Sequence, residues 1–323
     1  MRAAYAVRAD PDEPVRALEV GDRPDPEVPD GWVPVTVRAA ALNQHDVWSL
    51  RGVGLRGEQL PMILGCDAAG VTADGREVIV HAVVNDPDFV GADTTHDPRR
   101  SLLSERYPGT LAARVRVPTD NLVEKPAELS FVEAACLPTA WLTAYRMLFT
   151  QSGLKPGDTV LVQGAGGGVA TALVGLARHA GFRVWVTSRD EGRGARAVEL
   201  GAHQAFASGA RLPERVDAVM DSVGAATWSH SINALRPGGT VVLCGTTSGP
   251  DPAKAELTKI FFRALRVAGS TMGTREELVA VTRMLVATGL RPLVDRVLPL
   301  ASAAEGFAAL VDGDVFGKVV FTP

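Results

Sequence analysis

Cysteine is scarce in this sequence, whose 323 residues include three of them. Cys66, Cys136 and Cys244 are widely spaced, and no two of them form a C-x-x-C pair. An odd number of cysteines at such spacing excludes the disulfide framework that small secreted domains use. We therefore expect the protein to work in a reducing compartment, and we predict a cytoplasmic location.

Long apolar runs and an excess of one charge are also missing. No run approaches the roughly eighteen uncharged apolar residues of a membrane-spanning helix, and the opening MRAAYAVRADPDEP lacks the apolar core of a signal peptide. The net charge is -4, and charges of both signs are interspersed along the chain. Such a chain attracts neither nucleic acid nor an anionic membrane, so we expect a soluble protein without those partners.

The sequence does contain enough apolar residues, 46% of the total, for two domains. Up to residue 129, short alternating runs such as WVPVTVRAAAL predict an antiparallel, barrel-like β domain. From residue 130, helix-like stretches alternate with apolar strands such as TVVLCG, which predicts a parallel sheet covered on both faces. The helix-like REELVAVTRMLVATGL and the closing strand GKVVFTP do not continue this alternation. We therefore predict an α/β protein with one discontinuous domain, residues 1–129 and 275–323, and a nucleotide-binding domain, residues 130–274.

The stretch VLVQGAGGGVATALVGLARHAG, residues 160–181, runs from a strand pattern through four glycines into a helix pattern. A dinucleotide fold needs glycine at this turn because a side chain would keep the backbone away from the pyrophosphate. The helix N-terminus then offers unpaired N–H groups. The alternative is a turn that is glycine-rich for conformational reasons alone. The predicted cofactor contacts of the turn are Ala165, Gly166, Gly167, Gly168 and Val169, with Gly167 closest to the pyrophosphate.

The residues after the next strand favour NADPH over NADH. Counting about twenty residues from the turn reaches Thr187, where an NAD-selective fold usually carries a carboxylate. The following SRDEGRGAR places Ser188, Arg189 and Arg193 where a 2′-phosphate would lie, and a guanidinium binds phosphate in a bidentate manner. A solvated basic loop is the alternative, since Asp190 and the adjacent Glu191 stand among the arginines.

Several segments resemble the medium-chain dehydrogenase/reductase superfamily, and within it the zinc-independent, quinone-oxidoreductase-like members. These segments are ALNQHDVWSLRG, PMILGCDAAGV, GTLAARVRVPTDNLVEKPAELSFVEAACLPTAWLTAYRML, the glycine turn, VDAVMDSVG and GKVVFTP. The resemblance implies a Rossmann domain with a doubly wound parallel sheet and a GroES-like β-barrel domain that binds substrate. It also implies further cofactor contacts after the later strands and near the C-terminus: Ser222, Gly224, Cys244, Gly245, Met272, Gly273 and Lys318. A solvated lysine is the alternative at the last of these positions.

The same resemblance argues against a catalytic metal. Zinc-dependent members hold the ion with a Cys, a His and a further Cys, and the matching positions here are Asn43, Cys66 and Thr139. One thiolate does not make a three-ligand zinc site. Asp67 and His45 lie close to these positions in sequence but make a poor substitute. We therefore expect no metal, and we leave open whether Cys66 is reactive or a small buried hydrophobe.

Without zinc to stabilise an alkoxide, the natural hydride acceptors are quinones and α,β-unsaturated carbonyls, which delocalise the added charge. The resemblance likewise implies an NADPH-dependent quinone or enone oxidoreductase. Asn43 is predicted to donate a hydrogen bond to the carbonyl oxygen, and Thr139 to orient the nicotinamide or its ribose. In the alternative reading, Asn43 only caps a turn and Thr139 only begins a helix.

Other functions remain open at this point. Reduction of an enoyl thioester uses the same hydride chemistry, and a catalytically silent NADPH-binding protein is a third reading. A short-chain dehydrogenase is excluded because none of Tyr5, Tyr107 and Tyr145 has a lysine four residues on. The strand-like FFRALRVAGSTM predicts a homodimer through sheet-edge pairing. The long polar segment 84–109 predicts a surface loop, whose role the sequence leaves open.

Overall fold

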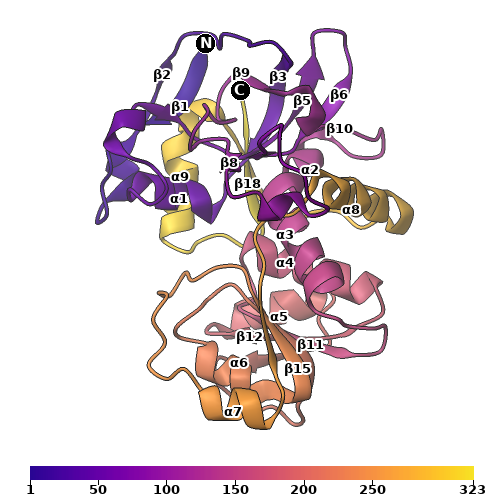
Figure 1. The fold of residues 1–323 in the computed structure, drawn as a ribbon. Helices are drawn as coiled ribbons and strands as arrows, with labels where there is room; N and C mark the ends of the chain where they lie inside the picture. The colour runs from indigo at the N-terminus through magenta and orange to yellow at the C-terminus, as the bar shows by residue number, and fades with distance from the viewer. The chain divides into compact units, whose positions relative to one another are not determined.

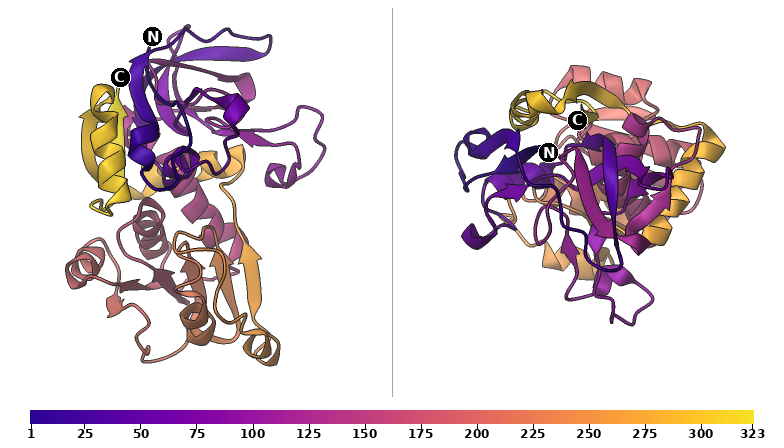
Figure 2. Two further views of the ribbon diagram at one scale, coloured as in Figure 1. Left: turned by 90° about the vertical axis from the view of Figure 1, so that its left-hand side faces the viewer. Right: turned by 90° about the horizontal axis from the view of Figure 1, so that it is seen from above.

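The computed structural model of the protein describes residues 1–323. Its packing divides the chain into two compact units: unit 1 comprises residues 1–140 and 274–323, and unit 2 comprises residues 141–273. Residues 130–140, which the sequence pattern placed with the nucleotide-binding half, belong to unit 1. Both chain termini lie in unit 1 and are close to each other in all three views (Figures 1 and 2).

Unit 1 is built mainly from antiparallel strands. Its strands are β1 (Arg2–Ala6), β2 (Leu18–Asp22), β3 (Trp32–Ala41), β4 (Met62–Ile63), β5 (Asp67–Thr72), β6 (Glu77–Val80), β7 (Val83–Val84), β8 (Ser101–Leu102), β9 (Arg114–Pro118), β10 (Leu122–Glu124), β17 (Val294–Pro299) and β18 (Lys318–Thr322). The largest sheet has the order β10-β6-β5-β3-β18-β17, and β9 also pairs with β3. The C-terminal strand β18 pairs with β3, so the last residues of the chain complete the sheet that begins near its start.

The helices of unit 1 are α1 (Gln44–Leu50), α2 (Phe131–Ala135), α8 (Arg275–Thr288) and α9 (Ala303–Val311). Helix α8 shows how the local sequence sets its limits. Thr274 accepts a hydrogen bond from the Glu277 N–H, and the Glu277 carboxylate accepts one from the Thr274 N–H, a reciprocal N-terminal cap. Gly289, with a φ of +72°, ends the helix in the left-handed conformation that favours glycine.

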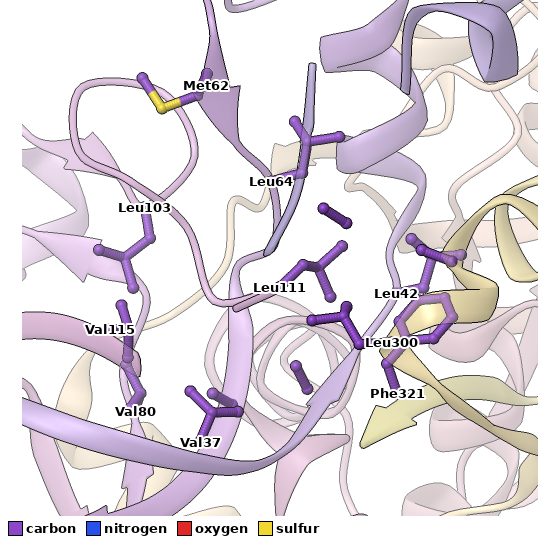
Figure 3. Packing of buried hydrophobic residues seen from close by; sticks show 14 of the residues in the cluster. Val37, Leu42, Met62, Leu64, Val80, Leu103, Leu111, Val115, Leu300 and Phe321 are labelled. Atoms are coloured by element: carbon purple, nitrogen blue, oxygen red, sulfur yellow. The ribbon is translucent and has the colours of Figure 1, made fainter. Parts of the chain in front are cut away.

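The core of unit 1 is mainly aliphatic, with side chains from its strands, α1, α9 and the connecting loops (Figure 3). Phe321 of β18 and Phe307 of α9 are fully buried in it and stack at 6.5 Å between ring centroids. Figure 3 shows Phe321 beside Leu42 and Leu300, which come from distant parts of the chain. This apolar packing fixes β18 against the end of β3, and thereby places Lys318 next to Asn43.

Unit 2 contains one six-stranded parallel sheet in the order β13-β12-β11-β14-β15-β16. Its strands are β11 (Thr159–Gln163), β12 (Arg183–Ser188), β13 (Gln204–Ala207), β14 (Val216–Asp221), β15 (Leu235–Leu243) and β16 (Arg266–Gly269), and its helices are α3 (Leu142–Tyr145), α4 (Gly168–His179), α5 (Glu191–Glu199), α6 (Trp228–Ala234) and α7 (Leu257–Phe262). The order reverses at β11, because β12 lies on one side of it and β14 on the other. Ligands of such sheets bind at the carboxyl ends of the strands beside this reversal.

The predicted fold class is confirmed, and some details differ from the predicted pattern. Residues 257–262 form the helix α7, so of the strand-like FFRALRVAGSTM only residues 266–269 are a strand. The segment 84–109 contains the short strand β8 and is anchored by the buried Asp97, which accepts hydrogen bonds from the Asp86 and Arg99 N–H groups. None of the helices combines the length and the apolar composition that a membrane-spanning segment needs.

Candidate active and cofactor-binding residues

The glycine turn lies between β11 and α4 in unit 2. Gly164, directly after β11, has a φ of +84°, which favours glycine. Gly167 is the N-cap of α4, and a methyl group added to its Cα would meet no heavy atom within 4 Å. A pyrophosphate needs such an opening to reach the free N–H groups of the helix N-terminus. The geometry suits the predicted role of the turn, and contact of its residues with a cofactor stays a prediction.

Thr187, the position that the motif spacing reaches, is fully buried beneath this turn. Its hydroxyl donates to Gln163 Oε1 at 2.7 Å and accepts from the Gly164 N–H at 3.2 Å. The side chain therefore holds the turn in place. Ser188 is the last residue of β12, at the carboxyl end of the strand, and it too lacks a carboxylate.

The loop after β12 carries the predicted 2′-phosphate site. The Ser188 hydroxyl donates to the Asp190 carbonyl oxygen at 2.6 Å, and the Asp190 carboxylate accepts from the Arg193 N–H at 2.7 Å as the N-cap of α5. The negative charge of Asp190 is thus directed at the positive end of a helix dipole. Arg189 is exposed and makes no hydrogen bond or ion pair within the protein. A guanidinium is therefore available at the carboxyl end of β12.

The adjacent strands β14 and β15 bring together four more predicted cofactor residues, Ser222, Gly224, Cys244 and Gly245. The Asp221 carboxylate accepts from the Gly224 N–H at 3.1 Å and shapes the turn after β14. Gly224 has a φ of +89°, and a methyl group there would lie 2.8 Å from the Gly249 carbonyl oxygen. Burial, with a smaller contribution from Asp221, raises the pKa of the Cys244 thiol to about 12, so this thiol is protonated at neutral pH.

The last two predicted cofactor residues of unit 2 are Met272 and Gly273. Met272 has a φ of +44°, a conformation that is uncommon for a residue with a side chain. Such backbone conformations occur often at ligand sites. The contact of both residues with the nicotinamide carboxamide stays a prediction.

In unit 1, Asn43 lies between β3 and α1, and its side chain is fixed by a buried lysine. Asn43 Oδ1 accepts a hydrogen bond from Lys318 Nζ at 2.5 Å, and Asn43 Nδ2 donates to the Ala41 carbonyl oxygen over a long 3.4 Å. One N–H of the amide thus has no protein partner. The contacts orient the amide with its oxygen toward the ammonium and its nitrogen available to another acceptor.

Lys318 is 2% exposed, and all three of its ammonium hydrogens have acceptors. Besides Asn43, they are the Leu42 carbonyl oxygen at 2.8 Å and Asp67 Oδ2 at 3.1 Å. The sequence placed Lys318 near the cofactor on resemblance alone. The structure directs its ammonium to Asn43 and Asp67, and a cofactor contact remains a prediction.

A second cluster of unit 1 consists of His45, Cys66 and Glu105. His45 Nδ1 lies 3.5 Å from Cys66 Sγ, and His45 Nε2 lies 2.9 Å from Glu105 Oε1. Burial raises the pKa of the Cys66 thiol. Burial lowers the pKa of His45, and the neighbouring carboxylates of Glu105 and Asp46 raise it. Cys66 is 1% exposed, in agreement with a buried rather than an accessible thiol.

Two residues of this cluster, together with the adjacent Asp46, are close enough to one another to hold a metal ion. Ligand atoms of His45, Asp46 and Cys66 all lie within 4.8 Å of one another. Both carboxylate oxygens of Asp46 are already engaged, one by the Asn43 N–H at 2.9 Å and the other by the Gly65 N–H at 3.0 Å. Asp46 thereby holds the N-terminus of α1 against the loop before β5.

Thr139 lies in a π-helical segment, Leu137–Trp141. Its hydroxyl oxygen is buried and has no hydrogen-bond partner in the protein. An unpaired buried hydroxyl is costly, and single π-helical turns are frequent at functional sites. Both features suit a side chain that binds a ligand.

Comparison with known proteins decides the family. The alcohol dehydrogenase GroES-like domain matches residues 29–127, and the zinc-binding dehydrogenase family matches residues 168–287. A zinc-type alcohol dehydrogenase-like protein of Schizosaccharomyces pombe is 30% identical over 317 residues, which span 90% of each chain. The chain belongs to the medium-chain dehydrogenase/reductase superfamily. The resemblance inferred from the sequence motifs is therefore confirmed at the level of the superfamily.

Other members of the superfamily differ in their described activities. An acryloyl-coenzyme A reductase of Metallosphaera sedula is 27% identical, and a quinone oxidoreductase of Lama guanicoe is 28% identical; each alignment spans 95% of this chain and 97% of the relative. A crystal structure of an NAD-dependent alcohol dehydrogenase is 34% identical, with a TM-score of 0.92 over the full length of both chains. The structure of crotonyl-CoA carboxylase/reductase AntE in complex with NADP is 25% identical, with a TM-score of 0.90 over 100% of this chain and 94% of that one.

The residues at the zinc positions of the superfamily do not fit a catalytic zinc. Asn43 Oδ1 is bound to the Lys318 ammonium, and an ammonium at this place repels a second cation. Cys66 Sγ instead contacts the Leu103 carbonyl oxygen at 3.3 Å and His45. Thr139 supplies a hydroxyl, which is a poor zinc ligand beside a single thiol.

Sequence reasoning missed two arrangements in unit 1. It treated Lys318 as a cofactor residue and did not connect it with Asn43 or Asp67. It also set His45 aside and did not foresee its contacts with Cys66 and Glu105. Neither arrangement has a local sequence signal, because each depends on long-range packing of β18, β5 and the segment after β8.

Proposed function

We propose that this chain is an NADPH-dependent reductase of quinones or α,β-unsaturated carbonyls that needs no catalytic metal. The observation that carries the proposal is the Asn43 amide. Its oxygen is held by Lys318, and one of its N–H groups has no protein partner. A fixed donor of this kind can stabilise negative charge that develops on a carbonyl oxygen. It replaces, at the same sequence position, the first ligand of a catalytic zinc.

The cofactor is NADPH, bound at the carboxyl ends of the parallel strands of unit 2. The opening at Gly167 admits the pyrophosphate, and the free guanidinium of Arg189 beside Ser188 binds the 2′-phosphate. The NADP complex of AntE supports this choice. The related NAD-dependent alcohol dehydrogenase points the other way, so the preference has to be measured on this chain.

The bound cofactor supplies a hydride from its nicotinamide, and the protein positions the reactants. Asn43 Nδ2 donates a hydrogen bond to the oxygen of the acceptor, where charge develops during hydride transfer. The Thr139 hydroxyl orients the nicotinamide or its ribose. No protein side chain forms a covalent intermediate in this scheme. The thiols of the buried Cys136 and the partly buried Cys244 are protonated at neutral pH, because desolvation raises their pKa values to about 12, and this suits that assignment.

An enoyl thioester is the second candidate substrate. It is favoured by the acryloyl-coenzyme A reductase that aligns with 95% of this chain. The thioester carbonyl would accept the same hydrogen bond from Asn43, so the two candidates differ only in the remainder of the substrate. A protein that binds NADPH without catalysis is the third candidate.

We also propose that the protein forms a homodimer through the open edge of the unit 2 sheet. β16 is the last strand of that sheet, and Val267 on it is exposed. The neighbouring Phe261 and Phe262 stack on each other at 4.5 Å, and Phe262 is 77% exposed. An exposed edge with adjacent aromatic side chains suits association with a second copy. Sedimentation of a Phe262→Glu variant as a monomer, beside a dimeric parent, would support this assembly; a monomeric parent would contradict it.

The test of the proposed function is the rate of NADPH oxidation by chelator-treated protein with three acceptors: a benzoquinone, a simple enone and a short enoyl-coenzyme A. Turnover with the first or second supports the main proposal. Turnover confined to the thioester supports the second candidate. Tight NADPH binding without turnover on any of them supports a binding protein.

A further inference from the structure

We propose that the buried ammonium of Lys318 takes over part of the role of a catalytic cation, by orienting and polarising the Asn43 amide that binds the substrate oxygen. This inference rests on the proposed function of Asn43. Lys318 itself makes no contact with the substrate in this scheme, so it is a positioning residue.

The ammonium is placed and neutralised by residues from three separate segments. The Leu42 carbonyl oxygen and Asn43 Oδ1 come from the segment between β3 and α1, and Asp67 Oδ2 comes from the start of β5. Lys318 is 2% exposed and Asp67 is 0% exposed. Two such charges remain inside a protein only when they are paired and hydrogen-bonded. Asp67 therefore keeps a positive charge beside Asn43 in a place that water does not reach.

This charge acts on the amide in two ways. It fixes the amide rotamer, because only the oxygen of Asn43 can face a donor. It also draws electron density toward Oδ1, and a hydrogen-bonded chain polarised in this way makes the Nδ2–H groups stronger donors. The effect grows when negative charge develops on the acceptor oxygen, since the ammonium then attracts that charge across the amide. Orientation and polarisation at the moment of reaction are the contributions that lower a barrier.

A buried ammonium that serves stability alone is the simpler explanation, and unit 1 provides a second buried ammonium for comparison, although its carboxylate partner Glu77 is exposed. Lys125 is 7% exposed, and its ammonium donates to the Leu129 carbonyl oxygen at 2.6 Å and pairs with Glu77 at 2.9 Å. None of its hydrogen-bond partners is a predicted site residue. Lys125→Met therefore measures what loss of a buried ammonium costs when Asn43 is untouched.

The experiment is a double-mutant cycle on kcat, with Lys318→Met, Asn43→Ala and the double variant, and with Lys125→Met as control. Chelator-treated protein is assayed with NADPH and whichever acceptor the parent reduces, and NADPH affinity is measured separately by fluorescence. We expect Lys318→Met to lower kcat roughly 10- to 100-fold. This is the range found for residues that orient the direct ligands of a metal ion. NADPH affinity and the kcat of Lys125→Met should stay near the parent values.

The decisive result is the double variant. If Lys318 acts through Asn43, the double variant should be no slower than Asn43→Ala alone, because the amide that the ammonium polarises is already absent. The proposal is overturned if the losses of kcat in the two single variants multiply in the double variant. It is also overturned if Lys318→Met leaves kcat unchanged. Should Lys318→Met fail to fold, Lys318→Gln supplies a neutral donor for Asn43 Oδ1, and the same cycle applies. A parent that reduces no acceptor would refute the proposed function instead.

Discussion

The predicted sites of the two units are built in different ways. In unit 2 the predicted site is made of backbone turns at strand ends, with open space at Gly167 and one free side chain, Arg189. In unit 1 it is a closed network of buried side chains, in which Asn43, Lys318 and Asp67 fix one another. The first arrangement suits binding of a common cofactor. The second suits a donor that must be rigid when charge develops, and changes in the two units should therefore affect binding and turnover separately.

The largest effect is expected in unit 1, from Asn43→Ala. Loss of a fixed donor to a developing oxyanion should lower kcat about 100-fold, while the dissociation constant for NADPH stays unchanged. Steady-state kinetics measure kcat, and a fluorescence titration measures the dissociation constant for NADPH. Asn121→Ala is the control, because Asn121 is also a buried amide of unit 1 but its Nδ2 serves the His81 and Val83 carbonyl oxygens. A similar loss of kcat in both variants would assign Asn43 to structure.

In unit 2, Gly167→Ala should impair binding without harming the fold. The φ of Gly167 is -73° and a methyl group there meets no protein atom, so the free energy of unfolding should stay equal or rise by about 0.4–1 kcal/mol. The same methyl group would obstruct the pyrophosphate, and NADPH affinity should fall at least about 10-fold, which is about 1.4 kcal/mol.

Gly57→Ala is the matched control, since Gly57 in unit 1 also has open space at its Cα. Thermal unfolding and NADPH titration of both variants complete the test. Unimpaired NADPH binding by Gly167→Ala would mean that the glycine turn is only a turn.

Arg189→Ala should reduce the preference of the protein for NADPH over NADH. A charge-assisted hydrogen bond contributes about 1.5–3 kcal/mol, so NADPH affinity should fall about 10- to 100-fold while NADH affinity is unchanged. Arg183→Ala, at the amino end of the same strand, should leave both affinities unaltered. Equal losses for NADPH and NADH would remove the 2′-phosphate assignment.

The smallest effect is expected from Thr139→Val. Because the Thr139 hydroxyl is buried without a partner, its removal should leave the unfolding free energy unchanged or raise it by up to about 1 kcal/mol. Turnover should fall by a few-fold if the hydroxyl orients the nicotinamide or its ribose. Thermal unfolding together with kcat tests both parts, and a destabilised variant with normal kcat would favour a purely structural hydroxyl.

The comparison of the units also explains which features the sequence could predict. The parallel sheet, the glycine turn and the helix α8 follow from local patterns of apolar residues, glycines and capping residues, and the structure contains them. The spacing argument reached Thr187, one residue before the end of β12, because a count along the chain does not tell which residue ends the strand. The π-helical conformation around Thr139 has no pattern of its own in the sequence.

The network of unit 1 could not be predicted for a different reason. Lys318 lies 275 residues from Asn43 and 251 residues from Asp67 along the chain. Their contact depends on β18 pairing with β3, and β18 is held there by apolar packing around Phe321. No local pattern encodes such a contact. A resemblance transfers the position of Lys318 but not the direction of its side chain.

The most direct measurement is the rate of a single hydride transfer from NADPH to a quinone or enone by protein whose metal content has been reduced below stoichiometry and verified by elemental analysis. We predict a rate equal to that of untreated protein, and a clear decrease when the transferred hydrogen of NADPH is replaced by deuterium. A rate that falls in proportion to the metal removed, and returns when zinc is added, would contradict metal-free hydride transfer and would direct attention to His45, Asp46 and Cys66.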